Sequence, residues 1–290
     1  MSNYVLITES STDLSKEMIK SLGIIVEPLT YIIDGKEYDD KPVVTGKTAH
    51  EFYDEVRGGK MPTTSQINEH RFLELFRPIL ESGKDILYIG FSSALSGTVL
   101  RAKEASEQLL SEFSDRKIYV IDSKCASLGE GLLVYHAALM KNSGKPIDEV
   151  AKWVEQNKLH ICHWFTVDDL NHLKRGGRVS PTVALIGTML GIKPVMHVDN
   201  EGRLIPVSKV RGRRKSLDAL VDMAEKTIID PKNQMIFISH GDCIDNAKYL
   251  AEQMKKRLHV KEVYINFIGP VIGAHSGPGT VALFFLGTER

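Results

Sequence analysis

Hydroxyl side chains gather in the segment that follows an expected buried strand over residues 85–91. Ser92, Ser93, Ser96 and Thr98 lie there within seven residues, directly before an expected helix. In open parallel sheets, ligands bind beyond the carboxyl ends of the strands, and a helix N-terminus adds free N–H groups and a positive dipole end. A single serine there would ordinarily cap the helix, but the whole cluster favours an anion site. It is not a P-loop, because no Gly-Lys-Ser/Thr follows a glycine-rich turn.

Two other loops carry groups that could contact the same ligand. Residues 62–66 supply Thr63 and Thr64 before a second expected helix. Residues 268–279 place His275 among four glycines and two prolines, and glycine permits a positive φ and close approach of a ligand. Polar loops and lone histidines are usually structural, so from the residues alone the structural and the ligand-binding interpretation both stay open.

Two basic runs, residues 174–178 and 209–215, are the remaining conspicuous feature. Such runs usually form solvated faces, but they could also dock an acidic or nucleotide-bearing partner. Nucleic acid fits them poorly, because neither run has interleaved aromatic residues.

Several catalytic interpretations fail on the sequence. His160, Cys162 and His163 do not make a zinc site, because a strand sends Cys162 and His163 to opposite faces and no second cluster completes the set. The chain has neither Gly-x-Ser-x-Gly, the signature of an α/β-hydrolase, nor Gly-x-Gly-x-x-Gly, the signature of a dinucleotide site. Since no nucleophile and acid stand out as a pair, the best-formed site is expected to bind without reacting. We expect no metal and no cofactor.

The elements that must position these groups alternate between short apolar strands and amphipathic helices. In the first half this rhythm predicts a parallel sheet with helices on both faces. In the second half an expected hairpin around residues 199–202 predicts a mixed sheet. We therefore predict an α/β protein with two domains, residues 1–165 and 166–290. Within the first domain we expect a single strand over Ile24–Ile33 and a loop over Met61–Gln66.

Composition sets the class of protein. The chain has 290 residues, with 37 Lys plus Arg against 37 Asp plus Glu, so nothing global favours nucleic acid or an anionic membrane. No apolar run reaches the roughly 18 residues of a membrane span, and the N-terminus has no signal-peptide pattern. The three cysteines are odd in number and far apart, which is typical of a reducing cytosol. We expect a cytoplasmic protein.

Taken together, several motifs resemble those of the DegV family. Each motif is weak alone, but their order and spacing match that family over essentially the whole chain. One departure is Glu9, where the family usually has aspartate. The matching segments are Ile7–Leu14, Thr64–Gln66, Ser92–Thr98, Leu173–Arg178, Gly191–Pro194 and Gly273–Gly279.

The resemblance implies two α/β domains with a ligand tunnel between them, and a long-chain fatty acid of the palmitate, stearate or oleate class as ligand. It also implies a role in phospholipid metabolism, as the non-enzymatic subunit that presents the acyl chain to a separate fatty acid kinase, which makes acyl phosphate. The carboxylate would lie near Thr64, Ser93 and His275 in the loop that includes Gly273, although Thr63 and Ser92 stay open as alternatives. Acyl length and unsaturation are not determined.

Two further expectations concern the tail and the partner. The apolar segment Val183–Ile192, with Leu185, Ile186, Met189 and Leu190, either lines the tail or forms a core helix. Arg175 and Arg178 are expected to face the kinase, since arginine pairs well with carboxylate and phosphate. The alternative function is a lipid hydrolase or acyltransferase that uses Ser93 with His275. A regulatory lipid sensor is a third possibility that sequence does not separate from the carrier.

Overall fold

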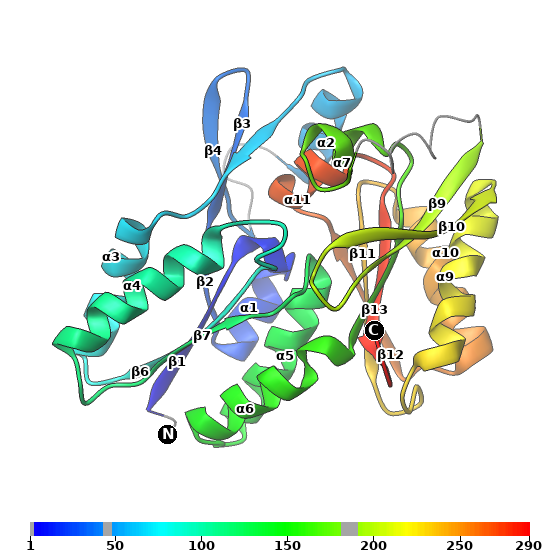
Figure 1. Ribbon diagram of the computed structural model, residues 1–290. Coiled ribbons are helices and arrows are strands. Elements are labelled where there is room, and N and C mark those ends of the chain that lie inside the picture. Colours follow the sequence, from blue (N-terminus) through cyan, green and yellow to red (C-terminus); the bar gives the residue numbers. More distant parts are fainter. Residues whose placement is uncertain (1–2, 43–47, 181–190) are drawn as a thin grey trace.

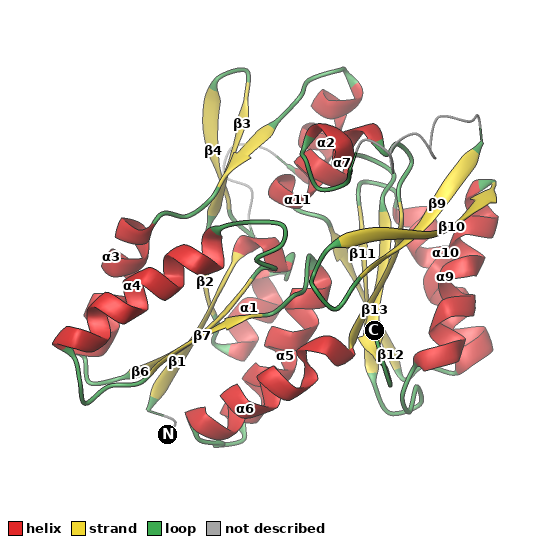
Figure 2. Ribbon diagram, viewed as in Figure 1, coloured by secondary structure: helices red, strands yellow, loops and turns green. Residues whose placement is uncertain are grey.

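Two larger β-sheets and one small sheet organise the chain in the computed structural model, which describes residues 3–42, 48–180 and 191–290 (Figures 1 and 2). The expected α/β class is confirmed, with a parallel first sheet and a mixed second sheet. Within the described residues no helix is both long and apolar enough to cross a membrane.

The first sheet consists of four parallel strands in the order β2-β1-β6-β7. Side chains alternate across it: Leu87 and Ile89 face one core, whereas Ile86 and Tyr88 face the other, as the two-residue period of a strand requires. The loops that follow β1, β6 and β7 leave the sheet at the same edge. The strands are β1 (Tyr4–Glu9), β2 (Ile25–Glu27), β6 (Asp85–Gly90) and β7 (Ile118–Asp122).

Helices cover both faces of the first sheet. On one face lie α3 (Glu69–Glu81) and α4 (Thr98–Glu112), whose apolar side chains share a core with Ile86 and Tyr88. The helices that cover the other face are α1 (Lys16–Leu22), α5 (Leu128–Asn142) and α6 (Ile147–Asn157).

A small antiparallel sheet stands beside the first one, and it corrects two expectations. Ile24–Ile33 is not one strand: it divides at Pro28 into β2 and β3 (Leu29–Ile33), which belong to different sheets, because proline cannot donate to a ladder. The expected loop at Met61–Gln66 contains β5 (Thr63–Ser65), which pairs with β3. Strand β4 (Lys36–Asp40) completes this sheet, and α2 (Ala49–Arg57) follows it in the chain.

The second sheet has the order β10-β9-β8-β13-β11-β12. Helices α9 (Arg213–Thr227) and α10 (Ile244–Leu258) pack on one face, against Val281, Leu283 and Phe285 (Figure 1). The strands are β8 (Ile161–Thr166), β9 (Ile192–Val198), β10 (Leu204–Arg211), β11 (Met235–His240), β12 (Glu262–Phe267) and β13 (Val281–Leu286).

Helix α5 packs against both larger sheets. Its buried residues Leu132 and Leu133 share one hydrophobic cluster with Leu87 of the first sheet and Phe284 of the second. The expected boundary between residues 165 and 166 falls inside β8, a strand of the second sheet. The second sheet therefore takes in residues that the sequence interpretation assigned to the first domain.

Short helical segments complete the described structure. They are η1 (Ser10–Thr12), η2 (Lys158–His160), α7 (Asn171–Arg175) and α11 (Pro270–Ser276).

Candidate functional site

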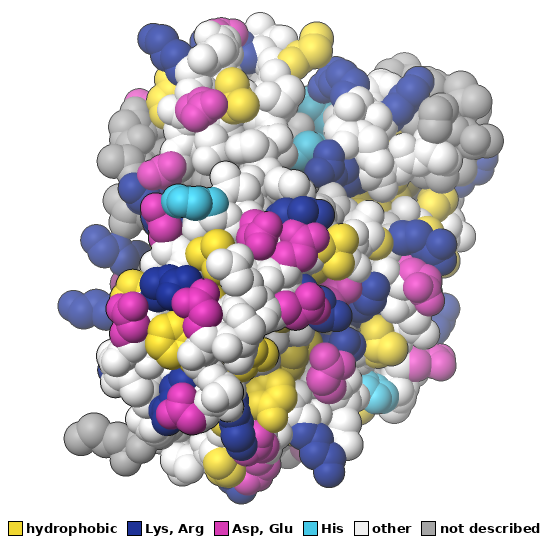
Figure 3. Space-filling model, turned by 60° about the vertical axis from the view of Figure 1, so that its left-hand side comes forward, with side chains coloured by type: hydrophobic (Ala, Val, Ile, Leu, Met, Phe, Trp, Pro, Cys, Tyr) yellow, Lys and Arg dark blue, Asp and Glu magenta, His cyan; other side chains and the backbone are white. Residues whose placement is uncertain are grey.

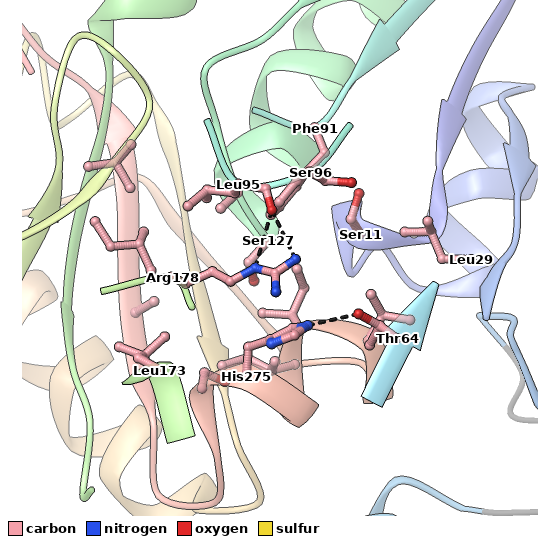
Figure 4. Close-up of a pocket in the computed structure, with 18 of the residues that line it drawn as sticks. Ser11, Leu29, Thr64, Phe91, Leu95, Ser96, Ser127, Leu173, Arg178 and His275 are labelled. Atoms are coloured by element: carbon pink, nitrogen blue, oxygen red, sulfur yellow. Dashed lines mark hydrogen bonds between the residues drawn. The ribbon is translucent and has the colours of Figure 1, made fainter. Parts of the chain in front are cut away.

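A cavity of about 420 Å³ lies where the loops that follow β1, β6 and β7 meet the second sheet, α7 and α11. Its volume falls within the range of small-molecule sites. Both sheets contribute to its wall, so the expected position of a ligand site between two α/β units agrees with the structure. Thr64, Arg178 and His275 lie near one another in the wall and are called the polar side here (Figure 4). Phe165, Ala282 and Phe284 of the second sheet form an apolar part.

His275 and Thr64 form a pair on the polar side (Figure 4). The Thr64 Oγ1 and His275 Nε2 atoms are 2.8 Å apart. Burial, together with the nearby charge of Arg178, lowers the pKa of His275 to about 4. The imidazole is therefore neutral at physiological pH, and it offers one donor and one acceptor.

Arg178 is the only lysine or arginine among the described residues of the cavity wall. Its Nε and Nη2 atoms donate to the Leu95 carbonyl at 3.2 and 3.0 Å (Figure 4). Its Nη1 atom donates to the Gly176 carbonyl. Burial lowers its pKa, but a guanidinium stays charged in proteins. Because these bonds use three of its five N–H groups, two remain for an anion.

The serine segment, residues 92–98, contributes Ser96 to the cavity wall, and not the expected Ser92 or Ser93. Ser92 donates to the Gly202 carbonyl at 2.9 Å, and Ser93 donates to Asp122 Oδ2 at 2.5 Å. Neither lines the cavity, whereas Ser96 does. The prediction that Ser92 or Ser93 holds a carboxylate therefore has no support from this geometry.

The alternative catalytic pair is not assembled. Ser93 is hydrogen-bonded to Asp122 and lies 3.2 Å from Lys124 Nζ, while His275 is bonded to Thr64. A serine nucleophile needs its base within hydrogen-bond reach. The geometry of the described residues therefore gives no support to a hydrolase that uses Ser93 with His275.

Three other expected residues lie outside the cavity wall. Thr63 is exposed, whereas Thr64 lines the cavity. Gly273 packs against α2, where an added Cβ would lie 2.7 Å from the Tyr53 hydroxyl. Arg175 is exposed and bonds to His172 Nδ1 at 2.9 Å. Gly273 thus positions α11, and Arg178, unlike Arg175, turns toward the cavity.

The expected tail residues Leu185, Ile186, Met189 and Leu190 lie outside the described residues, whereas Ile192 begins β9. The apolar side that the structure does describe comes instead from the second sheet. Phe165, Ala282 and Phe284 line it, and Ala282 is the cross-strand partner of Phe165. The sequence interpretation missed these residues, although the period-two pattern of β8 and β13 could have indicated that they share a face.

Buried carboxyl groups secure the helix that carries His275. Asp13 Oδ1 accepts the Gly269 N–H at 2.8 Å, and Asp40 Oδ2 accepts the Val271 N–H at 3.2 Å. Free N–H groups at a helix start need such acceptors. Residues 270–276 of the expected glycine-rich loop are consequently helical. Burial raises the pKa of Asp40 to about 7 and that of Asp13 well above its usual range.

Gly176→Ala is expected to displace the His275 ring. An added Cβ would lie 2.2 Å from His275 Nδ1, so the ring or the end of α7 must move. We expect altered His275 imidazole resonances and a free energy of unfolding lowered by about 1–3 kcal/mol. NMR and urea unfolding measure these effects, with the exposed neighbour substitution Lys174→Ala as control. Unchanged imidazole resonances in Gly176→Ala would show that the contact is unimportant.

Asp40→Asn is expected to make stability less sensitive to rising pH. The raised pKa of Asp40 means that folding favours its protonated form, so this contribution is complete below about pH 4 and is lost as pH rises through about 7. Asparagine keeps an acceptor for the Val271 N–H but does not titrate. The free energy of unfolding should therefore fall less in the variant than in the wild type between about pH 5 and 8.

Urea unfolding across that pH range measures the difference. Histidines with a lowered pKa, such as His136 at about 4, contribute with the opposite sign but equally in both proteins, so they cancel in the comparison. Parallel pH profiles for the two proteins would contradict the expectation.

Two α/β units enclose one cavity that has polar and apolar parts, and this arrangement defines the class of two-unit α/β proteins with a ligand site between the units. Comparison with known proteins gives the family. The protein-family model described as "Uncharacterised protein, DegV family" matches residues 3–288 of this chain. A DegV domain-containing protein of Clostridium perfringens is 48% identical over 290 residues, which is 100% of this chain and 99% of the relative. This chain belongs to the DegV family.

Solved structures agree with this assignment. A DegV family protein from Thermus thermophilus, described for its fatty acid binding, matches with a TM-score of 0.88 and 30% identity, covering 98% of this chain and 99% of that one. DegV of Bacillus subtilis, described as a fatty acid binding protein, matches with a TM-score of 0.83 and 29% identity, covering 99% and 100%.

Proposed function

We propose that this protein binds a long-chain fatty acid in the cavity, with the carboxylate on the polar side and the tail against the second sheet. The observation that carries the proposal is the position of Arg178: a guanidinium with two uncommitted N–H groups lies beside the neutral His275–Thr64 pair in a largely apolar cavity. In this proposal Ser96, which lines the cavity, contacts the carboxylate in place of Ser93.

The physical chemistry of the cavity supports an amphipathic anion. A buried carboxylate is costly unless charged or hydrogen-bonding partners replace water, and charge-assisted hydrogen bonds are the strongest replacement. Each methylene that leaves water contributes about 0.8 kcal/mol. Burial of the tail would therefore supply most of the affinity, and the polar groups would set the orientation. The fatty-acid-binding relatives from Thermus thermophilus and Bacillus subtilis support the same ligand class.

The test is mass spectrometry of the purified protein, native for the intact chain and denaturing for its organic extract. A stoichiometric long-chain fatty acid is the expected result, and its mass reports the preferred acyl length and unsaturation. A protein that is empty and also takes up neither oleate nor palmitate would overturn the proposal. The cavity would then have to be reinterpreted as a site for a smaller anion.

We further propose that the protein acts without catalysing a reaction, as a cytoplasmic carrier in phospholipid metabolism that presents its acyl chain to a fatty acid kinase. The unassembled Ser93–His275 pair supports a carrier, and the exposed Arg175 at the end of α7 is a suitable contact for an acidic partner surface. Elsewhere the charges are mixed: Figure 3 shows Lys or Arg side chains interspersed with Asp or Glu on the face in view.

Arg175→Glu tests the kinase proposal. Acyl-phosphate formation with the kinase should fall sharply, because the reversed charge repels an acidic surface, while fatty-acid binding stays unchanged. Lys152→Glu, on the distant helix α6, is the matched charge-reversal control. Unchanged acyl-phosphate formation in Arg175→Glu would exclude this residue from the contact.

A further inference from the structure

A buried glutamate in the cavity wall has one carboxyl oxygen without a hydrogen bond. Glu9 is the last residue of β1, is fully buried and lines the cavity. Its Oε1 atom accepts the Phe91 N–H at 2.6 Å, which fixes the carboxyl group between β1 and the loop after β6. Its Oε2 atom is buried and has no hydrogen-bond partner. A buried polar atom without a partner is costly, so a ligand group that satisfied it would gain binding free energy.

The protein offers Oε2 no well-formed alternative among its described residues. The Tyr88 hydroxyl, itself buried without a partner, lies close enough to lower the pKa of Glu9 by hydrogen bonding, but no hydrogen bond of normal geometry joins the two groups. Two hydroxyls of the wall are engaged elsewhere: Ser11 donates to Glu130 Oε2 at 2.9 Å, and Ser127 donates to Asp13. Figure 4 shows Ser11, two residues after Glu9, on the side of the cavity opposite Leu173.

The carboxyl group is suited to a neutral partner. Burial raises the pKa of Glu9 to about 7, so both protonation states are accessible near neutral pH. A protonated carboxyl donates one hydrogen bond and accepts others, whereas a carboxylate only accepts. A hydroxyl group can donate and accept, and therefore matches either state. A second carboxylate would be repelled, and a methylene would leave the oxygen unsatisfied.

We propose that Glu9 is a second polar ligand position, which takes a hydroxyl group on the acyl chain and makes the protein selective for monohydroxy long-chain fatty acids. This inference rests on the proposed function: Arg178, His275 and Thr64 hold the carboxylate, and Glu9 binds a hydroxyl group farther along the same acyl chain. Selectivity then depends on where along the chain the hydroxyl lies, because the cavity fixes the path from one polar position to the other.

The experiment compares the affinities of stearate and of a panel of monohydroxystearates with the hydroxyl near the carboxylate, in mid-chain or near the methyl end. In the wild type, one positional isomer should bind about tenfold more tightly than stearate. In Glu9→Leu this ratio should fall to about one, with stearate still bound. Glu27→Gln is the matched control: Glu27 is buried and pairs with Glu9 across β2 and β1, but it bonds to Arg71 and does not line the cavity. Its ratio should equal that of the wild type.

Difference infrared spectroscopy gives a readout that does not require Glu9→Leu to fold. Binding of the preferred isomer should shift the C=O stretch of a protonated carboxyl group, and this band should be missing in the conservative variant Glu9→Gln. The inference is overturned if stearate binds but no isomer exceeds it, or if the preference persists without Glu9. If neither stearate nor any isomer binds, the proposed function itself fails, so the two failures are distinguishable.

Discussion

Arg178→Met is expected to weaken fatty-acid binding by about ten- to a hundredfold. A hydrogen bond to a charged group contributes about 1.5–3 kcal/mol, and every 1.4 kcal/mol changes a dissociation constant about tenfold. Methionine keeps much of the aliphatic length but removes the charge. The ligand carboxylate would then be buried with only the neutral His275–Thr64 pair and Ser96 as partners.

Displacement of a fluorescent fatty acid measures this effect, and Arg175→Met is the matched control. Arg175 lies three residues away but is exposed and bonded to His172, so its loss should leave affinity unchanged. If both variants bind as the wild type does, the carboxylate lies elsewhere in the cavity. If Arg175→Met alone weakens binding, the assignment of the two arginines must be exchanged.

Asp13→Ala is expected to lower the free energy of unfolding by about 3 kcal/mol or more, whereas Asp13→Asn should have a much smaller effect. The Asp13 carboxyl accepts hydrogen bonds from Ser127 and from the Gly269 N–H, and so connects η1 to α5 and to the start of α11. Alanine leaves the Gly269 N–H without this acceptor and leaves the Ser127 hydroxyl with Ser239 as its remaining partner. Since burial raises the pKa of Asp13 well above its usual range, the native group resembles the neutral amide of asparagine.

The backbone of Asp13 requires a separate control, because its φ of 52° is a conformation that asparagine and aspartate tolerate better than alanine does. Asp230→Ala supplies it: Asp230 also has a positive φ, 41°, but is exposed. Urea unfolding of the three variants separates backbone strain from the loss of the buried carboxyl group. Equal destabilisation by Asp13→Ala and Asp230→Ala would show that the carboxyl contacts add nothing.

Local signals in the sequence were sufficient for the class of fold and for two side chains, Thr64 and His275, that the structure brings together. The strands and helices follow from the two-residue and 3.6-residue apolar periods, which each segment carries by itself. The parallel first sheet and the mixed second sheet follow from the order of those elements. The serine segment was recognisable because it follows a strand of the parallel sheet, at the edge where ligands bind. Thr64 and His275, which the structure pairs, lie instead in β5 of the small antiparallel sheet and in α11.

Only the tertiary structure decided which side chains of those loops face the cavity. Ser96 rather than Ser93 lines it, because Asp122 and Lys124 of the neighbouring strand and loop engage Ser93, and a loop has no period from which a direction could be predicted. Arg178 turns inward because a carbonyl 83 residues away accepts its N–H groups. Segment 270–276 is helical because Asp13 and Asp40, more than 200 residues away, accept its first N–H groups. These choices depend on contacts between distant parts of the chain, whereas the propensities that sequence patterns report are local.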